Sequence, residues 1–383
     1  MRNKDEIRLQ RVVAFLCATL FVVFSFFFVS HYQSPLIELL YDHVATGKLE
    51  YNGYVVGAIL TVLLTLFAVW LNRFSKFQRE WTALSYLPSV LLLAFVTDID
   101  RTVYTGGSVG SKWLTVFAVG AFAYAAFSFV LQRVLFAKIK NVAMSASRII
   151  WRNMQIFVIL FCLAGILSNG EENLKREALV HSYYKKGKVD KALAVGYRSR
   201  TASQYLTAQR AYILASEGML GDKLFEYPQQ YGSDGLVPAP QQQSPLVPDS
   251  VYSLIGAVPS QGERASALLA RAVASDSLID ASKDYYLSAL LLDRRLVEFV
   301  NTVTAMYDSI PADELPKHYQ EALLLYASID DEAQVKVENT ALQEQFDAFR
   351  ALEKEHDDPF VRSNYVRRKF GRTYWWYYLY GNI

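Results

Sequence analysis

Five apolar stretches separated by polar segments occupy the first 168 residues of the chain. A helix needs about 20 residues to cross a bilayer, and roughly 17 to 25 are tolerated. The third stretch reaches this length only if Trp81 and Thr82 are included, and the fifth would extend over only about 24 Å at 1.5 Å per residue. The predicted spans are residues 12–30, 53–71, 81–97, 113–136 and 153–168.

The cations between these stretches predict an orientation. Positive residues are enriched in the cytoplasmic loops of membrane proteins. Twelve Lys and Arg residues lie on the side of the N-terminus, and only Lys48, Arg101 and Lys112 lie on the other side. We therefore expect a cytoplasmic N-terminus, a retained first helix rather than a cleaved signal peptide, and export of everything after Asn169.

From Glu171 onward, the apolar positions recur with a helical period in short pieces, as in stacked helical hairpins. Leu179, Tyr183, Gly187 and Ala192 follow one another at offsets of 4, 4 and 5, which match a tetratricopeptide (TPR) hairpin in part. The glycine would end the first helix, and the alanine would let the second helix approach closely. Gly218 is the corresponding glycine of a second unit, 31 residues later rather than the ideal 34.

A Pro- and Gln-rich loop, residues 228–250, interrupts this array, and helices are expected to resume near Gln261. The fold class is therefore predicted to be all-α. A five-helix transmembrane domain, residues 1–168, precedes a soluble TPR-like helical-hairpin domain, residues 169–383. Within the second domain, helices are expected over residues 285–292, 294–309, 315–328 and 332–356.

The composition also differs between the two predicted domains. Charged residues occupy 23 of the first 168 positions and 53 of the last 215, as expected for a membrane domain joined to a water-soluble one. The chain is 52% hydrophobic with a net charge of only +2, which argues against disorder and against nucleic-acid binding. Both cysteines, Cys17 and Cys162, lie in apolar runs, so residues 169–383 contain neither a disulfide framework nor a thiolate metal site.

Catalytic chemistry has few candidates. Asp98 and Asp100 are paired acids in a predicted exported loop, where they are either solvated loop charges or a metal or general-base site. His181, His318 and His356 are expected to be ordinary surface or groove residues. The spans contain no acidic or basic residues except at their ends, which argues against ion transport. We predict no metal ion and no cofactor.

Gly120 and several neighbouring alanines form a small-residue face in the fourth predicted span, which suits close helix packing. The C-terminal stretch has a different character, because basic residues precede a dense aromatic run. These rings either pack on the final helices or rest at a membrane or partner interface. The aromatic residues are Tyr374, Trp375, Trp376, Tyr377 and Tyr378.

Several segments together carry a family resemblance: Tyr51-Asn52-Gly53, Leu84 to Ser89, Leu224 to Pro228, Leu315 to Leu323 and Gly371 to Tyr378. They resemble uncharacterised multi-pass membrane proteins of Bacteroidota with a TPR-like C-terminal region. This resemblance implies an inner membrane and a periplasm as the two compartments, and it carries over no activity.

A looser similarity is to glycan-handling membrane enzymes that end in TPR repeats and carry acidic residues in an exported loop. In this chain, Asp98 and Asp100 would match those acidic residues. The expected function is a membrane-anchored scaffold that presents a periplasmic domain to a protein partner. The alternative is a glycosyltransferase-like enzyme or accessory. The predicted partners are the lipid bilayer and a protein. No nucleic-acid partner is predicted, and the oligomeric state does not follow from the sequence.

Overall fold

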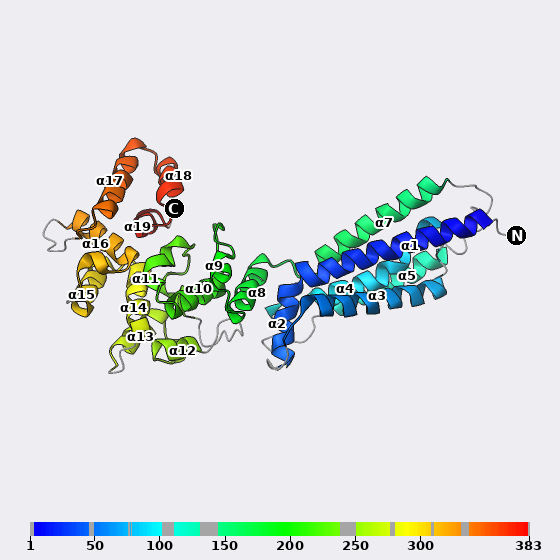
Figure 1. The fold of residues 1–383 in the computed structure, drawn as a ribbon, viewed down its shortest axis with the longest axis horizontal. Helices are drawn as coiled ribbons and strands as arrows, with labels where there is room; N and C mark the ends of the chain where they lie inside the picture. Colours follow the sequence, from blue (N-terminus) through cyan, green and yellow to red (C-terminus); the bar gives the residue numbers. More distant parts are fainter. Residues whose placement is uncertain are drawn as a thin grey trace. The chain divides into compact units, whose positions relative to one another are not determined.

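The computed structural model (Figure 1) describes residues 4–45, 50–75, 77, 79–101, 111–130, 145–237, 250–275, 280–307, 310–330 and 337–381. Every regular element in these ranges is a helix, and no strand occurs among them. The predicted all-α class is therefore confirmed. The chain forms two compact units, Met1–Ala178 and Leu179–Ile383, and each has its own core.

The N-terminal unit is a bundle of long apolar helices (Figure 1). Helix α1 packs against α3 and α7, and α4 packs against α3, α5 and α7. The elements of this unit are α1 (Lys4–Phe27), the π-helix η1 (Phe28–Tyr32), α2 (Ser34–Ala45), α3 (Gly53–Ser75), the 3-10 helix η2 (Arg79–Tyr86), α4 (Leu87–Thr97), α5 (Ser111–Val130) and α7 (Ala146–Leu167). The division between the two units falls within the next helix, α8 (Glu172–Lys185).

Four helices of this unit are long and apolar enough to cross a membrane: Ile7–Tyr32, Gly53–Asn72, Lys112–Val130 and Ala146–Leu167. Large apolar side chains such as Phe15, Phe122 and Ile159 point outward, whereas the polar side chain of Asn153 is buried. This distribution is the one expected of helices surrounded by lipid. Residues 131–136, the end of the predicted fourth span, lie outside the described residues.

The last span is longer than the apolar pattern predicts. Helix α7 begins at Ala146, seven residues before the predicted start, and its 22 residues extend over about 33 Å. Arg148 and Arg152 lower the local hydropathy but do not interrupt the helix. The length is therefore sufficient for a hydrocarbon core of about 30 Å.

The third predicted span, Trp81–Thr97, is a shorter apolar helix built from two types of turn. Pro88 lies in the first turn of α4, where its missing N–H is tolerated, so the segment before it cannot continue that α-helix regularly. This segment forms the eight-residue η2 instead. Because a 3-10 helix rises about 2 Å per residue, η2 and α4 together extend over about 30 Å.

Glycines set the closest helix approaches in this unit. A Cβ atom on Gly57 would lie 2.9 Å from Ser30 Cβ, and one on Gly53 would lie 2.7 Å from Ser34 Oγ, so α3 contacts the η1–α2 junction through small residues. In α5, Gly120 lies against Leu91, but the alanines beside it are exposed. Only the glycine of that predicted face is therefore in a close contact among the described residues.

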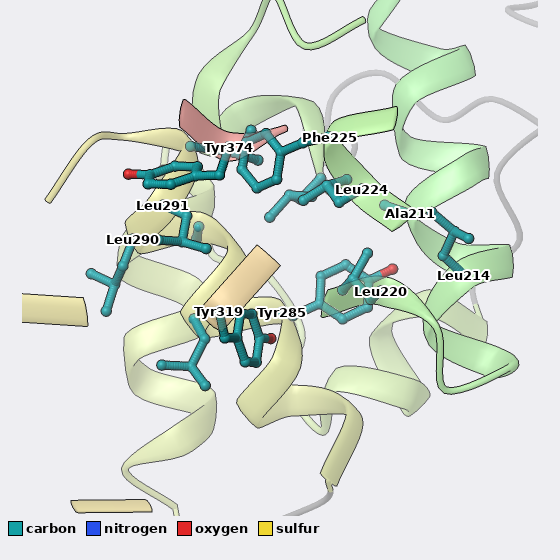
Figure 2. Close-up of a cluster of buried hydrophobic side chains, with 14 of the residues drawn as sticks. Ala211, Leu214, Leu220, Leu224, Phe225, Tyr285, Leu290, Leu291, Tyr319 and Tyr374 are labelled. Carbon is teal, nitrogen blue, oxygen red and sulfur yellow. The ribbon is translucent and has the colours of Figure 1, made fainter. Parts of the chain in front are cut away.

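The C-terminal unit consists of shorter helices around α14, which packs against α10, α11, α12, α13 and α15. Figure 2 shows its core, in which Leu220 lies beside Tyr285 and the ring of Phe225 lies beside Tyr374, with centroids 5.1 Å apart. Its α-helices are α9 (Val189–Ala194), α10 (Gln204–Ser216), α11 (Leu220–Lys223), α12 (Ser250–Ile255), α13 (Ala265–Val273), α14 (Asp280–Leu292), α15 (Leu296–Met306), α16 (Lys317–Ile329), α17 (Thr340–Glu355), α18 (Pro359–Phe370) and α19 (Tyr374–Tyr380), with 3-10 turns at η5 (Leu224–Glu226), η6 (Gly232–Gly235) and η7 (Ala312–Glu314).

Two predicted segments differ from the structure in detail. Helix α17 starts at Thr340 rather than at residue 332, because the Asn339 side chain accepts a hydrogen bond from the Leu342 N–H and caps the helix there. The predicted loop 228–250 contains η6, and Leu236 and Val237 after it are buried in the core. Residues 238–249 lie outside the described residues.

Candidate functional site

Asp98 and Asp100 lie just after the C-terminus of α4. Asp98 Oδ2 accepts hydrogen bonds from Lys112 Nζ at 2.8 Å and from Trp113 Nε1 at 2.7 Å. Both donors belong to α5, so the carboxylate ties the end of α4 to the start of α5. Asp100 is exposed. No cluster of three or more His, Cys, Asp or Glu side chains that suits a metal ion occurs among the described residues.

The segment after Asp98 continues this set of polar contacts. Arg101 donates to Glu177 at 2.8 Å and to Glu171 at 3.1 Å, and Glu177 is completely buried. Partial burial acts to lower the pKa of Arg101, but the hydrogen bonds and charges of Glu177 and Glu171 outweigh it, so the pKa of Arg101 is raised. These contacts join the helix ends of the N-terminal unit and give this region a structural role.

The two glycines predicted to end the first helix of a hairpin do so in the structure. Gly187 and Gly218 have φ values of +67° and +66°, the left-handed conformation that favours glycine. After α8, Lys188 N–H donates to Tyr183 C=O and Gly187 N–H to Tyr184 C=O, both at 2.9 Å. The same two bonds follow α10, where Met219 N–H donates to Leu214 C=O and Gly218 N–H to Ala215 C=O. Both turns are therefore Schellman caps.

The other predicted packing residues of the first hairpin, Leu179, Tyr183 and Ala192, are buried to different extents. Ala192 is completely buried, and Tyr183 is half-buried against the core of the C-terminal unit. Leu179 is only half-buried, whereas its neighbour Val180 is 1% exposed. The buried face of α8 is therefore centred one residue further along than the spacing predicts.

A third turn of the same geometry carries no glycine. Between α14 and α15, Arg295 N–H donates to Leu290 C=O at 2.9 Å and Arg294 N–H to Leu291 C=O at 3.1 Å. Arg294 has φ of +58°, and no other non-glycine residue among those described has a positive φ. The sequence pattern predicted a join between helices 285–292 and 294–309, but not a left-handed residue in it, because arginine gives no signal for that conformation.

A small apolar pocket of about 150 Å³ lies between the first helices of two successive hairpins, α8 and α10. The rings of Tyr184 and Tyr212 meet edge to face, with centroids 5.7 Å apart. Burial raises the pKa of Tyr184, so its hydroxyl stays neutral at physiological pH. Lys185, at one side, is exposed. The lining residues are Val180, His181, Tyr184, Lys185, Gln209, Tyr212 and Ile213.

The C-terminal aromatic run forms α19, which packs in the core of the C-terminal unit. Tyr374 and Trp375 are completely buried, and Trp376, Tyr377 and Tyr378 are half-buried against the same core. Trp375 Nε1 donates to Glu321 C=O at 2.7 Å, and the Tyr377 hydroxyl donates to Leu292 C=O at 2.7 Å. Of the two alternatives for this run, the described contacts are those of packing.

His318 is not a surface residue. It is completely buried, and its Nδ1 lies 2.8 Å from Oε2 of Glu321, which is also completely buried. The same Glu321 oxygen accepts the Tyr374 N–H at 2.7 Å, and the His318 ring meets Phe225 edge to face. The polar neighbours of His318 in the sequence suggested exposure, but α16 is covered by α11, α15, α17 and α19. This buried pair therefore links α16 to α19.

Part of the chain matches a known protein family. Residues 262–381 match a family of unknown function (DUF6057). The matched region contains α13 to α19, and thus the Arg294 turn, the His318–Glu321 pair and the aromatic helix. It includes neither the hairpins at Gly187 and Gly218 nor the apolar helices. No curated protein and no solved structure matches the chain significantly.

Proposed function

We propose that the protein is a membrane-anchored scaffold whose C-terminal unit, a TPR-like array of helical hairpins, binds a protein partner through the pocket between α8 and α10. The pocket is the observation that carries this proposal. It lies between the first helices of two successive hairpins, and helical-repeat proteins use such surfaces to bind peptides. The three matching turns support the repeat character.

The proposal also assigns compartments. Twelve cations against three favour a cytoplasmic N-terminus and, with five spans, a C-terminal unit on the other side of the membrane. The resemblance to Bacteroidota membrane proteins supports identifying these compartments as the inner membrane and the periplasm. A partner would then be a periplasmic protein, or a membrane protein with a periplasmic segment.

The glycosyltransferase-like alternative would rest on Asp98 and Asp100. Asp98 Oδ2 is already occupied by Lys112 and Trp113, and these contacts account for the residue by its role in joining two helices. No observation favours the enzyme over the scaffold, so we do not propose it.

Site-specific photo-crosslinking in intact cells tests the scaffold. A photoreactive phenylalanine analogue replaces Tyr184 or Tyr212 in the pocket, and Tyr231 serves as the control because it is 42% exposed and lies outside the pocket. We expect one discrete protein adduct from both pocket positions and none from the control. Failure to obtain an adduct at either pocket position, or equal adducts at all three positions, would contradict the proposal.

A further inference from the structure

A set of exposed cations gathers at the end of α18. Arg367, Arg368, Lys369 and Arg372 are exposed and lie within six residues of one another. The Arg372 guanidinium lies 4.1 Å from the centre of the Tyr197 ring, in the loop between α9 and α10. We call these residues the basic patch, together with two more exposed arginines from that loop: Arg198, Arg200, Arg367, Arg368, Lys369 and Arg372.

The geometry of α18 directs the patch away from the core. Ser363, Val366 and Phe370 are buried and define the inner face of the helix. At 100° per residue, the opposite face is centred on Val361, Tyr365 and Arg368. Arg367 and Lys369 flank this face, so the last turn of α18 presents cations on three sides.

Ion pairing distinguishes the patch from much of the same unit. Arg271, Arg295 and Arg350 each form a hydrogen-bonded ion pair with a glutamate on their own segment. None of the six patch residues forms an ion pair with any residue that the structure describes. The acids nearest in sequence, Asp357 and Asp358, lie at the opposite end of α18. Glu226 accepts a hydrogen bond from the Tyr197 hydroxyl at 3.3 Å and so lies near Arg372, but one carboxylate leaves the six cations with a local excess of positive charge.

Aromatic rings hold four of these cations in place. Besides Arg372 on Tyr197, Arg367 lies 5.3 Å from the Trp376 ring centre, Arg368 lies 5.6 Å from that of Tyr365, and Lys369 lies 5.3 Å from that of Phe370. A guanidinium group stacked on a ring keeps its N–H donors directed outward at the ring edge, where they suit the oxygens of a phosphate group.

Exposed apolar side chains lie on the same helix as the cations. Tyr365, 47% exposed, lies about one turn before Arg368 and Lys369, whereas Phe360 and Val361, 68% and 39% exposed, lie in the first turn of α18. Cations together with an exposed tyrosine and aliphatic groups are typical of surfaces that lie at lipid headgroup level. Nucleic acid and acidic protein offer the same negative charge but no layer into which these apolar groups would insert.

We propose that the basic patch docks on the surface of a membrane that contains anionic phospholipids, with the headgroup phosphates as hydrogen-bond acceptors. Four to eight clustered Lys and Arg residues suffice for such binding. The same chain carries four helices long enough to cross a bilayer, so a lipid surface is tethered to the patch at high effective concentration. This docking is independent of the α8–α10 pocket.

Vesicle co-flotation of the full-length protein tests the proposal. The protein is held in nanodiscs of phosphatidylcholine, and vesicles of phosphatidylcholine with or without phosphatidylglycerol are added. We expect binding only to the anionic vesicles. The triple variant R367Q/R368Q/K369Q should lose about a hundredfold in partitioning, since each cation contributes about a fivefold factor.

The control variant K188Q/K191Q/K354Q removes three other exposed lysines and should bind as the parent does. An unchanged thermal midpoint of the patch variant shows that it remains folded. Amide exchange of residues 361–372 in anionic nanodiscs gives a second measurement, and we expect slower exchange than in neutral nanodiscs. Equal binding to neutral vesicles, equal loss in the control variant, or patch-dependent binding to RNA or an acidic peptide but not to anionic lipid would overturn the proposal.

Discussion

Arg294 combines backbone strain with an anchoring role. Its φ of +58° costs a non-glycine residue about 1 kcal/mol, and the structure retains it for its side-chain contacts. Arg294 Nη2 donates to Tyr377 C=O at 3.0 Å, and the guanidinium lies over the Tyr377 ring. A residue in the turn between α14 and α15 thereby holds α19 in place.

Two substitutions separate strain from anchoring. Arg294→Ala removes the contacts with Tyr377 but keeps the strain, whereas Arg294→Gly removes both. We therefore expect Arg294→Gly to be more stable than Arg294→Ala by about 1 kcal/mol, measured by unfolding of the full-length protein in detergent. Gly187→Ala, at an equivalent turn, should cost a similar amount. Equal stability of the two Arg294 variants would show that this backbone position is not strained.

Asp284 makes the stability of the C-terminal unit depend on pH. Burial raises its pKa above the ordinary 3.8, against the opposing effect of hydrogen bonds donated by Tyr319 and Tyr307. Because the folded state disfavours the carboxylate, Asp284 lowers stability once the pH exceeds the raised value, and this cost disappears below 3.8, where the group is protonated in both states.

The neutral isostere Asp284→Asn can accept the same hydroxyl hydrogen bonds without carrying a charge. We expect it to raise the thermal midpoint at pH 7 and to match the parent once the pH falls below 3.8. Asp347→Asn is the control, since that side chain is exposed on α17 and its charge does not contribute to the raised pKa of Asp284. A gain that persists unchanged at low pH would exclude burial of the charge as its cause.

Residue roles were predictable where the amino acid itself carries the conformational signal. Gly187 and Gly218 were identified as helix-ending residues because few other residues adopt a positive φ. The left-handed conformation of Arg294 and the burial of His318 could not be inferred in this way. Arg294 contacts Tyr377 of α19 and His318 contacts Phe225 of η5, and both partners are distant in sequence.

Within the N-terminal unit, a backbone N–H of η2 donates a hydrogen bond to a side chain of another helix. Asn153 of α7 accepts the Ala83 N–H at 2.7 Å through Oδ1, and its amide donates to Ile149 C=O at 2.9 Å. The thiol of Cys17 in α1 also points to this oxygen, at 3.8 Å. A single buried amide thus joins three elements where apolar surroundings offer no water.

Asn153→Leu should therefore lower the stability of the full-length protein in detergent by about 1–2 kcal/mol, because the Ala83 N–H would lose its acceptor. Met154→Leu is the matched control, since Met154 is the next residue of α7 and is 38% exposed. If the two variants unfold at the same temperature, the hydrogen bond from Ala83 does not stabilise the bundle.

Hydropathy located the apolar helices but not their limits or their type. It missed the first turns of α7, because a helix continues beyond the hydrocarbon edge where Arg148 and Arg152 are favourable. Pro88 indicated a disturbance in the third span but not that a 3-10 helix would precede it. The π-helix after Phe27 has no sequence signal, and it lies where Ser30 comes close to Gly57 of α3.

For the whole molecule, the side of the membrane on which the C-terminal unit lies depends on whether Trp81–Thr97 crosses. If η2 and α4 cross, five spans leave twelve cations on the side of the N-terminus and three on the other. If they do not cross, four spans leave nine and six, and the five cations between residues 131 and 152 are placed outside. The positive-inside rule therefore favours the five-span arrangement, and the length of η2 with α4, about 30 Å, permits it.

Fusions to the C-terminus of the full-length chain distinguish the two arrangements. Five spans predict an active alkaline phosphatase fusion and a dark green fluorescent protein fusion, because phosphatase folds only after export and the fluorescent protein only before it. A fluorescent fusion at the N-terminus is the control and should be bright. The reverse pattern at the C-terminus would establish four spans, place the α8–α10 pocket and the basic patch in the cytoplasm, and move the search for a protein partner to that compartment.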